Sequence, residues 1–549
     1  MKWTNFRARK QYQPRRILPV ASGRENTHPS RTETSQERTN SSSVKVEECV
    51  EYAMSDKDKA SSIHIWALGV VAVMGGQLYG WNAAFASGFL PFALSQVITG
   101  LAYIIYMSSA AEVSGKIAFS GGSYGLARIT LGYYCGFMVG FLELLEYVAS
   151  ASVSVRYVGD FIITQFDLDP LYQFWIWALF YIVFIGIFQL HGRIYWNFMV
   201  FFALSCLLPT ILYFFATVGS ANLSKYAAMD ENGTQYNATG AKVWASGDIS
   251  SSYFAWLPYT TWAYAGVESV TLVTSTTINP KQSMPRGMML STYTLFASNA
   301  LLLFLVPSIA PGIATCLDDN FPLNNGFANL GISEVLGQWL ILPAQMGMAA
   351  GFFLPYSYLT QALANSNLLP SSLGLKNQTS TFRCMVASSL FGYFLCVLGY
   401  FSPEFQSAMQ NLFILAATFC YGAQLVGFVM LRTTYHTETS GYSSPFGIKG
   451  AIFSGLIYLL IALSIAGGFQ GDNGIAVIAL LGFIVLLTLY YHFICKHGQS
   501  LSKDEYATVF RFSVMKYNSL RSNRKPRPVH RSSIDHEGIA FLRRLSAKT

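Results

Sequence analysis

Three carboxylic acids stand inside otherwise apolar stretches of this chain. Glu143 and Glu146 share one such stretch, and Glu268 lies in another. Glu143 and Glu146 are three residues apart, which places both side chains on one face of a helix. A charge at the centre of a membrane helix costs about 2.5 to 3.5 kcal/mol on insertion scales, so such a residue is functional by default. These carboxyl groups are candidates for binding an amine or carrying a proton.

Two interpretations remain open for each carboxyl group. In the first, Glu143 contributes to a substrate site, and Glu143, Glu146 and Glu268 are candidates for taking up a coupling proton. In the second, they are buried glutamates whose hydrogen bonds to hydroxyls or backbone fix the packing of helices. Arg128, near the end of the same apolar stretch, is expected to be a surface anchor whose charge reaches the headgroups.

Glycines and polar residues interrupt the apolar stretch from His64 to Phe89. Gly75-Gly76 and Gly80 bracket a polar insert, and aromatic residues accompany them. An unpaired backbone amide in hydrocarbon costs several kcal/mol, so a break at this depth survives only where it faces a protein-lined cavity. We therefore predict a substrate site here, formed by Gly75, Gly76, Gln77, Tyr79, Gly80 and Trp81.

The stretch from Phe254 to Thr274 repeats this pattern, with aromatic residues followed by Ala263 to Gly266 and then Glu268. The two interrupted spans are five spans apart and run in opposite directions, which indicates an inverted repeat. The free amides of a half-helix can hold an anionic group, and aromatic rings can stack on an amine. We add Tyr264, Ala265 and Gly266 to the predicted site. Alternatively, the glycines are packing residues and the aromatic residues form interfacial belts.

The composition indicates a membrane protein. Of 549 residues, 52% are hydrophobic and 12% are charged, and the mean hydropathy is +0.36, whereas roughly 25% of a soluble domain is charged. A run of about 20 apolar residues spans a bilayer, and about twelve such runs lie between Ile63 and Cys495. We predict an all-α integral membrane protein with about 12 transmembrane helices: a 5+5 inverted repeat with broken helices 1 and 6, plus two peripheral helices.

The expected organisation has three parts. A disordered cytosolic tail covers residues 1–62, and a basic cytosolic tail covers residues 496–549. The membrane domain between them, residues 63–495, comprises repeat one (63–218), a glycosylated outer loop (219–252), repeat two (253–431) and two further helices (450–495).

The orientation follows from glycosylation sequons and loop charge. Asn222, Asn232 and Asn237 each begin an N-x-[ST] sequon in the one long loop of the first half, which favours an outer face for that loop. Lys and Arg concentrate in the loops on the opposite side, as the positive-inside rule requires. Both termini are therefore expected in the cytosol, and the plasma membrane is the expected location.

Five motifs carry a resemblance to a known family. GGQLYGWN, SGGSYGLAR, ELLEYV, GVE and NPKQSMPRG occur in this order. Together they resemble the amino acid, polyamine and organocation permease superfamily, and most of all its ethanolamine permease branch. The resemblance implies the inverted-repeat fold, a substrate held between spans one, three, six, eight and ten, and alternating access. The acidic pair that many members carry before the NP motif is absent, since the chain reads TLVTSTTINP.

The residues of span eight indicate which ion is coupled to transport. Sodium-driven relatives place paired hydroxyls there, and this chain has Ala349 and Ala350 in the matching region. Because hard cations need several oxygen ligands, proton coupling, exchange or uniport is expected. We expect no cofactor, no metal site and no nucleic-acid partner. The expected partners are a small solute, the lipid bilayer and protons.

A secondary-active permease for an amino acid or small amine, such as ethanolamine, is the leading hypothesis. A membrane enzyme is disfavoured because no HExxH motif, nucleophile elbow or acidic metal cluster occurs in the sequence. A channel would need a repeated filter or a charged ring. A nutrient sensor that does not transport would share every motif named here. The sequence does not choose between ethanolamine and an amino acid.

Overall fold

Helices build all of the regular structure in the described part of the chain. The computed structural model describes most residues from 56 onward, and these belong to one compact unit that spans Tyr52–Thr549. The described residues are 56–116, 121–190, 192–231, 233–236, 241–246, 249–317, 319–374, 378–435, 441–501, 505–511, 513–514 and 517.

Nine helices among the described residues are long and apolar enough to cross a membrane, which confirms the predicted class. The exact number of twelve spans stays a prediction. These nine are α3 (Phe89–Lys116), α5 (Tyr133–Phe166), α6 (Gln173–Phe188), α7 (Arg193–Thr217), α10 (Pro280–Leu305), α15 (Gln378–Phe401), α16 (Pro403–Thr433), α17 (Gly447–Ala466) and α18 (Ile475–Tyr490).

Three further segments, which we number with the spans as the first, the sixth and the eighth, consist of shorter pieces. The first consists of α1 (Ser62–Val73), α2 (Gly75–Leu78) and the 3₁₀ helix η2 (Trp81–Ser87). The sixth consists of α9 (Ile249–Trp256) and the 3₁₀ helices η4 (Leu257–Ala263) and η5 (Val267–Thr276), and the eighth of α13 (Glu334–Ala350) and α14 (Phe353–Asn365). Short elements connect the spans: η1 (Asp56–Asp58), α4 (Gly122–Thr130), η3 (Pro170–Tyr172), α8 (Leu223–Tyr226), η6 (Val306–Ser308), α11 (Ile313–Cys316), α12 (Asn324–Ala328), η7 (Ser371–Leu373), the π-helical turn η8 (Tyr491–Cys495) and α19 (Lys496–Gly498).

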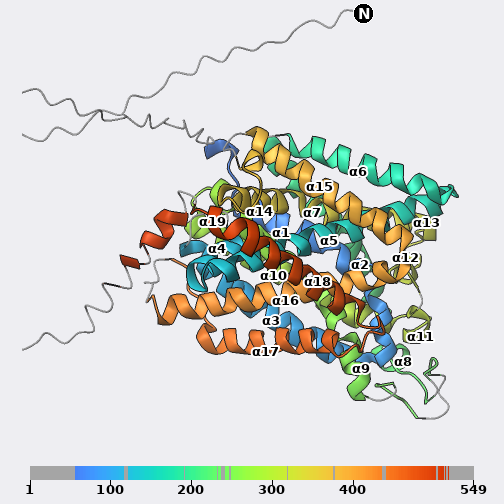
Figure 1. The fold of residues 1–549 in the computed structure, drawn as a ribbon. Helices are drawn as coiled ribbons and strands as arrows, with labels where there is room; N and C mark the ends of the chain where they lie inside the picture. Colours follow the sequence, from blue (N-terminus) through green and yellow to red (C-terminus); the bar gives the residue numbers. More distant parts are fainter. Residues whose placement is uncertain are drawn as a thin grey trace, which may run out of the picture. The chain divides into compact units, whose positions relative to one another are not determined.

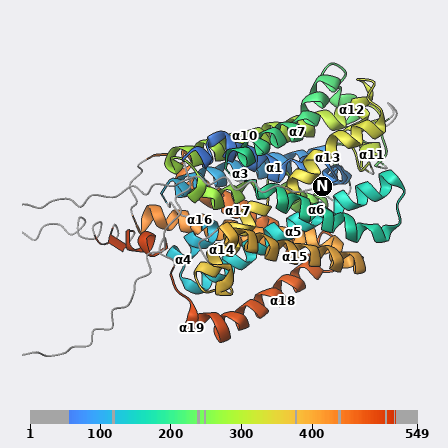
Figure 2. The same cartoon turned by 90° about the horizontal axis from the view of Figure 1, so that it is seen from above.

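The two ends of the helix bundle carry different short elements. Figure 1 shows α4 and α19 at one end, which we call the tail face, and α8, α11 and α12 at the other, which we call the loop face. The helix α18 lies at the edge of the bundle (Figure 2), where it packs on α16 and buries only Ala476, Leu480 and Leu487. By contrast, α17 packs against α3 and α16 and buries Tyr458.

The first and sixth spans run in opposite directions. The amide of Ala60, just before α1, donates to the carbonyl of Thr276 at the end of η5 (2.9 Å). At the loop face, the amide of Leu90, just after the first span, donates to the carbonyl of Trp244, which precedes α9 (2.9 Å). The start of each span therefore lies beside the end of the other, as the inverted repeat predicts.

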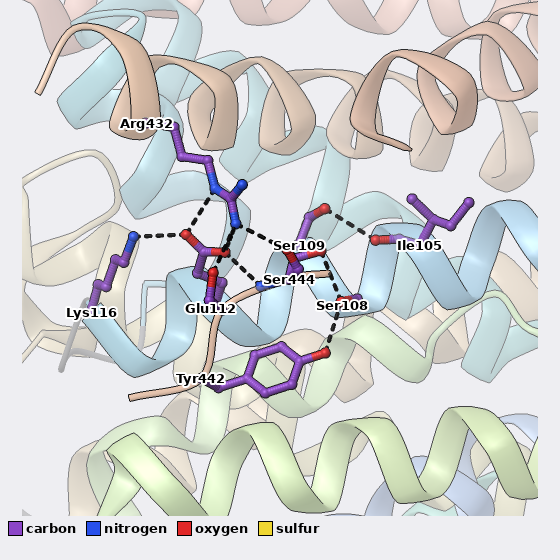
Figure 3. Close-up of polar contacts among 9 residues, drawn as sticks. Ile105, Ser108, Ser109, Glu112, Lys116, Arg432, Tyr442 and Ser444 are labelled. Carbon is purple, nitrogen blue, oxygen red and sulfur yellow. Dashed lines mark hydrogen bonds and ion pairs between the residues drawn. The ribbon is translucent and has the colours of Figure 1, made fainter. Parts of the chain in front are cut away.

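A buried carboxylate holds the tail-face ends of three segments together (Figure 3). Glu112, in the last turn of α3, accepts hydrogen bonds from Lys116 Nζ (2.7 Å), from Nε (3.1 Å) and Nη2 of Arg432 on α16, and from the amide of Ser444 (2.8 Å). Its side chain is 1% exposed. A buried charge is stable in a fold only when it is paired and hydrogen-bonded, so this cluster fixes α3 to α16 and to the segment that precedes α17.

The third span begins later than its apolar run indicates. In the sequence, the apolar run of the third span starts at about Leu126. In the structure, α4 ends at Thr130 and α5 begins only at Tyr133. Gly132 separates them with a φ of +96°, a backbone conformation that glycine adopts without strain. As a result, α4 is a separate helix that packs against α5 and α16 at the tail face.

The prediction that Arg128 is a surface anchor is wrong. Its side chain is 1% exposed, and its Nη1 pairs with Glu505 Oε1 at 3.1 Å. Its Nη2 donates to the carbonyl of Ser500 (2.8 Å), and Ser366 Oγ donates to Glu505 Oε2 (2.8 Å). The chain that follows the last span thus folds back onto α4 and the end of α14, where its carboxylate neutralises the buried arginine.

Several predictions concern residues outside the described part of the chain. They include most of the amino-terminal tail (1–55), the sequon residues Asn232 and Asn237, and the basic segment of the carboxyl-terminal tail (518–549).

The ion pair between Arg128 and Glu505 is expected to hold the tail segment in place. Removing one partner of a buried pair costs about 3 kcal/mol or more, so Glu505→Gln should speed amide hydrogen exchange of residues 496–511 by about 100-fold. Glu231→Gln, which removes an exposed carboxylate on the loop face, is the control. The double variant Arg128→Gln/Glu505→Gln leaves no unpaired charge and should recover protection. Equal exchange in the wild type and in Glu505→Gln would contradict this role.

Candidate functional site

The first span departs from a continuous helix beside Gly75-Gly76 and again at Gly80, the two predicted positions. Tyr79 is extended (φ −141°, ψ 129°) and Gly80 has a φ of +74°, whereas Gly75 and Gly76 are helical. The regular helix is nevertheless interrupted at Met74, directly before this glycine pair, because α1 ends at Val73 and α2 begins at Gly75. A Cβ atom on Gly76 would lie 2.2 Å from the carbonyl oxygen of Trp262, so these glycines allow another span's backbone to approach.

The second break lies where the sequence predicts it. Tyr264 leaves the helical path with φ −141° and ψ −30°, and Gly266 has a φ of +101° between η4 and η5. A Cβ atom on Gly266 would lie 2.4 Å from the ring of Phe352, so both the backbone conformation and the space require glycine.

Side chains satisfy backbone groups at the second break. Gln77 Nε2, on α2, donates to the carbonyls of Ala263 (2.8 Å) and Leu295 (2.9 Å). Glu268 Oε2 accepts a hydrogen bond from the amide of Gly266 (3.1 Å). Because an unpaired buried backbone group is costly in hydrocarbon, these bonds stabilise the break, and Gln77 ties the first span to the sixth.

A small cavity, which we call the central pocket, lies where the two broken spans meet. It lies between the first, third, sixth, eighth and tenth spans and holds about 30 Å³ of free space, enough for one or two waters. Its described lining is uncharged and consists of Gly75, Gly76, Tyr79, Ser150, Val153, Tyr157, Trp262, Ala265, Gln345, Met348, Phe352, Gln410 and Phe413.

Aromatic rings and two amide side chains dominate this lining. Gln345 Nε2 donates to the carbonyl of Gly75 (3.3 Å), and Gln410 Nε2 donates to the hydroxyl of Tyr157. The indole nitrogen of Trp262 has no hydrogen-bond partner among the described residues. A mostly apolar cavity with a few convergent polar groups is typical of a small-molecule site.

A second cavity, which we call the vestibule, adjoins the central pocket on the loop-face side and holds about 240 Å³ of free space. It shares Tyr79, Tyr157 and Gln345 with the pocket. The ring of Tyr79 lies 5.0 Å from that of Tyr157 and 5.6 Å from that of Phe321, measured between centroids. These rings separate the two cavities. The remaining vestibule residues are Asp160, Phe161, Thr164, Gln165, Asn320, Phe321, Gln338, Ile341 and Leu342.

Glu143 lies away from the central pocket and contacts α4. Its carboxylate accepts hydrogen bonds from the amides of Ser123 (3.4 Å) and Tyr124 (3.2 Å) and from the hydroxyl of Tyr147 (3.1 Å). Carboxylates stabilise helix N-termini by satisfying free amides and opposing the helix dipole. In this structure Glu143 therefore anchors the first turn of α4 to the third span.

Glu146 and Glu268 form a carboxyl pair between the third and sixth spans. Both are 1% exposed, and the two carboxyl groups lie near enough to each other to interact electrostatically. The hydroxyl of Tyr421 donates to Glu146 Oε1 (2.8 Å). Glu146 Oε2 and Glu268 Oε1 have no hydrogen-bond donor among the described residues.

Four of the predicted binding residues line the central pocket: Gly75, Gly76, Tyr79 and Ala265. Gly80 and Gly266 form the turns of the two breaks, and Gln77 joins them. That these residues bind a solute stays a prediction.

Two predicted aromatic residues pack elsewhere. Trp81 contacts the rings of Phe85 and Phe92. Tyr264 stacks on Tyr103 with centroids 5.2 Å apart, and its hydroxyl accepts a hydrogen bond from Asn299 (3.0 Å). The packing of Trp81 fixes the backbone just after the first break, and the packing of Tyr264 fixes the backbone at the start of the second.

The resemblance implied that the third, eighth and tenth spans border the site, but sequence reasoning named none of the residues with which these spans line the pocket. One signal was present: Glu146, Ser150, Val153, Tyr157 and Asp160 recur at alternating intervals of four and three residues. This spacing places them on one face of a helix. That face runs from the carboxyl pair past the central pocket to the vestibule.

Two discontinuous spans that meet over a buried pocket, within a bundle of membrane-length helices, define a multi-pass membrane transporter. The sequence model of the amino acid permease family matches residues 63–488. The chain belongs to this amino acid permease family.

Individual relatives are distant. An uncharacterized transporter of Rhizobium meliloti (strain 1021) is 23% identical over 255 residues, which are 45% of this chain and 52% of that protein. The gamma-aminobutyric acid permease of Bacillus subtilis (strain 168) is 21% identical over 352 residues, 63% of this chain and 74% of that protein. The match therefore spans about half of the first relative.

A solved structure shares the fold. The manganese transporter of Eremococcus coleocola, solved in complex with an aromatic bis-isothiourea substituted compound, matches with a TM-score of 0.50 and 14% identity. The match covers 84% of this chain and 99% of the other. At this identity the likeness concerns the fold alone.

The contact between Gly76 and Trp262 is expected to tolerate no side chain. Gly76→Ala should lower the thermal midpoint of the purified protein, because overpacking of this kind costs about 1 to 3 kcal/mol. Gly186→Ala is the matched control, since a Cβ atom there meets nothing within 4 Å. An unchanged midpoint in Gly76→Ala would show that the two spans do not pack as described.

Proposed function

We propose that this chain is a secondary-active permease that moves an amino acid or a small amine by alternating access. The observation that carries the proposal is the central pocket, because it lies where the two broken spans meet. Broken spans at the midplane are the usual place where transporters of this architecture hold substrate. Membership of the amino acid permease family supports transport over catalysis.

Ethanolamine is the sharper substrate hypothesis. The pocket lining in the described residues is uncharged, so a solute charge must be met by ring faces and by backbone at the breaks. Tyr79, Tyr157 and Trp262 present rings suited to an ammonium group. The family match and the gamma-aminobutyric acid permease relative keep an amino acid as the other candidate.

Proton coupling is supported by the pair formed by Glu146 and Glu268. Two carboxylates that lie near each other in a low-dielectric interior repel each other strongly, so such a pair is stable when one of its members holds a proton. One added proton would also supply a donor for the two unpartnered oxygens, Glu146 Oε2 and Glu268 Oε1. Glu143 has three donors of its own, so we assign the proton to the pair.

Alternating access is supported by the asymmetry around the central pocket. Toward the loop face the vestibule continues the pocket and includes the exposed residues Thr164 and Asn320. Toward the tail face α4 packs on η5, where a Cβ atom on Gly122 would lie 2.9 Å from Leu272. We assign this arrangement to an outward-facing stage in which the rings of Tyr79, Tyr157 and Phe321 close the passage between the vestibule and the central pocket.

The proposed orientation places the loop face outside the cell and both termini in the cytosol, with the plasma membrane as the location. Glycosylation at Asn222, Asn232 and Asn237 belongs to this proposal. Asn222 is exposed at the start of α8, where its side chain accepts a hydrogen bond from the amide of Lys225 (3.0 Å).

Flux measurements test the function directly. Purified protein in liposomes should take up labelled ethanolamine or a labelled amino acid with saturation, and an inward proton gradient should drive accumulation. Glu146→Gln and Glu268→Gln should lose the response to the gradient yet keep solute exchange, because the proton carrier is removed but the pocket remains. Glu404→Gln, an exposed carboxyl on α16, is the control.

Other outcomes identify other functions. Saturable binding without flux would favour a nutrient sensor, and flux without saturation would favour a channel. A gradient response that survives in both glutamine variants would contradict the assignment of the proton to the pair.

The orientation has its own test. In a eukaryotic expression host, peptide N-glycosidase should shift the mobility of the wild type, and the triple variant Asn222→Gln/Asn232→Gln/Asn237→Gln should migrate at the shifted position without treatment. A wild-type protein that carries no glycan in a host that glycosylates a control membrane protein would argue against an outer location of residues 219–252.

A further inference from the structure

The vestibule contains one charged side chain among its described lining residues, Asp160. This residue lies on the same helical face of α5 as Tyr157, one turn nearer the loop face. Its Oδ1 accepts a hydrogen bond from Gln173 Nε2 (2.6 Å). Its Oδ2 accepts none from the described residues, so one carboxylate oxygen remains available to a solute.

The nearest basic side chain does not neutralise Asp160 by contact. Arg156 lies one turn back on α5, over the ring of Trp177 at 5.6 Å, and it acts on Asp160 electrostatically without an ion pair between these two described side chains. A carboxylate that is partly buried and not ion-paired makes the local potential negative, and cavity walls of low dielectric strengthen this effect. The vestibule therefore favours cations over anions.

Aromatic rings line the same cavity beside this carboxylate. Tyr79, Tyr157, Phe161 and Phe321 all contribute to its wall, and Phe161 and Phe321 lie 6.1 Å apart between centroids. Ring faces attract an ammonium group, and the attraction increases when the cation is partly desolvated. A carboxylate and several rings together suit an organic ammonium better than an inorganic cation, which prefers several oxygen ligands.

We propose that the vestibule is a separate binding site for the ammonium group of a small organic amine, with Asp160 as its counterion. This inference rests on the proposed permease function. The amine would bind here before the partition formed by Tyr79, Tyr157 and Phe321 opens to the central pocket. The free space of about 240 Å³ exceeds that of the central pocket, so the vestibule admits a solute while the pocket is closed. A neutral zwitterion gains little from Asp160, because its own carboxylate opposes the attraction.

The test compares ethanolamine with a zwitterionic amino acid in proteoliposomes. Asp160→Asn should raise the KM for labelled ethanolamine by about tenfold, which is the loss of affinity expected when one charge-assisted hydrogen bond is removed. The kcat should stay nearly unchanged. The KM for labelled alanine should change little. Raising the ionic strength should raise the ethanolamine KM of the wild type but not that of the variant, because salt screens the attraction.

Asp167→Asn is the matched control, since Asp167 is an exposed carboxylate at the end of the same helix and outside the vestibule lining. Its φ of +51° is a conformation that asparagine accepts. Equal KM values in Asp160→Asn and the wild type would overturn the proposal, as would an equal loss for both solutes with a lowered thermal midpoint.

Equilibrium binding separates this proposal from the permease function. Detergent-solubilised wild type should bind labelled ethanolamine more tightly than Asp160→Asn, whether or not any flux occurs. A protein that moves alanine but neither binds nor moves ethanolamine would overturn the vestibule site and leave the permease function intact. Ethanolamine binding that depends on Asp160 without flux of either solute would support the site and contradict the permease.

Discussion

The structure depends on how the backbone is satisfied at two breaks inside the membrane. At Tyr79-Gly80 and at Tyr264 to Gly266 the helical hydrogen bonds stop, and hydrocarbon offers no replacement. Protein groups satisfy the second break instead: Gln77 on the first span donates to the carbonyl of Ala263, and Glu268 accepts a hydrogen bond from the amide of Gly266. The second break is therefore stabilised by a side chain of the first span, and the central pocket lies where the two broken spans meet.

The same contacts place the buried carboxyl groups where they can respond to the pocket. Glu268 caps the second break and also meets Glu146 on the third span. Under the proposed mechanism, a change in the proton shared by this pair alters the acceptor at Gly266 and so the geometry of the break. Glu143 extends the connection to the tail face, since it holds the first turn of α4.

Much of the fold could be predicted from the sequence, because apolar length and glycine position determine spans in a bilayer. Glycine is ambiguous, however: it marks the second break at Gly266, but Gly75 and Gly76 serve packing against a carbonyl that only the fold brings near. Arg128 was misjudged because its partner, Glu505, lies 377 residues away. The faces that Gln345 and Gln410 present to the pocket likewise depend on packing between spans. The face of α5 that lines the pocket could have been predicted, because its residues from Glu146 to Asp160 recur at intervals of four and three along the sequence.

The central claim is that a solute occupies the pocket between the two breaks, and thiol modification tests it most directly. In a Cys135→Ser background, which removes an exposed cysteine, Ser150→Cys places a thiol in the pocket lining and Ser154→Cys places one a turn further along α5, fully buried. The account predicts that a small methanethiosulfonate reagent blocks uptake in Ser150→Cys, that transported solute slows this reaction, and that Ser154→Cys is unaffected. Modification of Ser150→Cys that leaves uptake intact, or that proceeds equally fast with saturating solute, would contradict it.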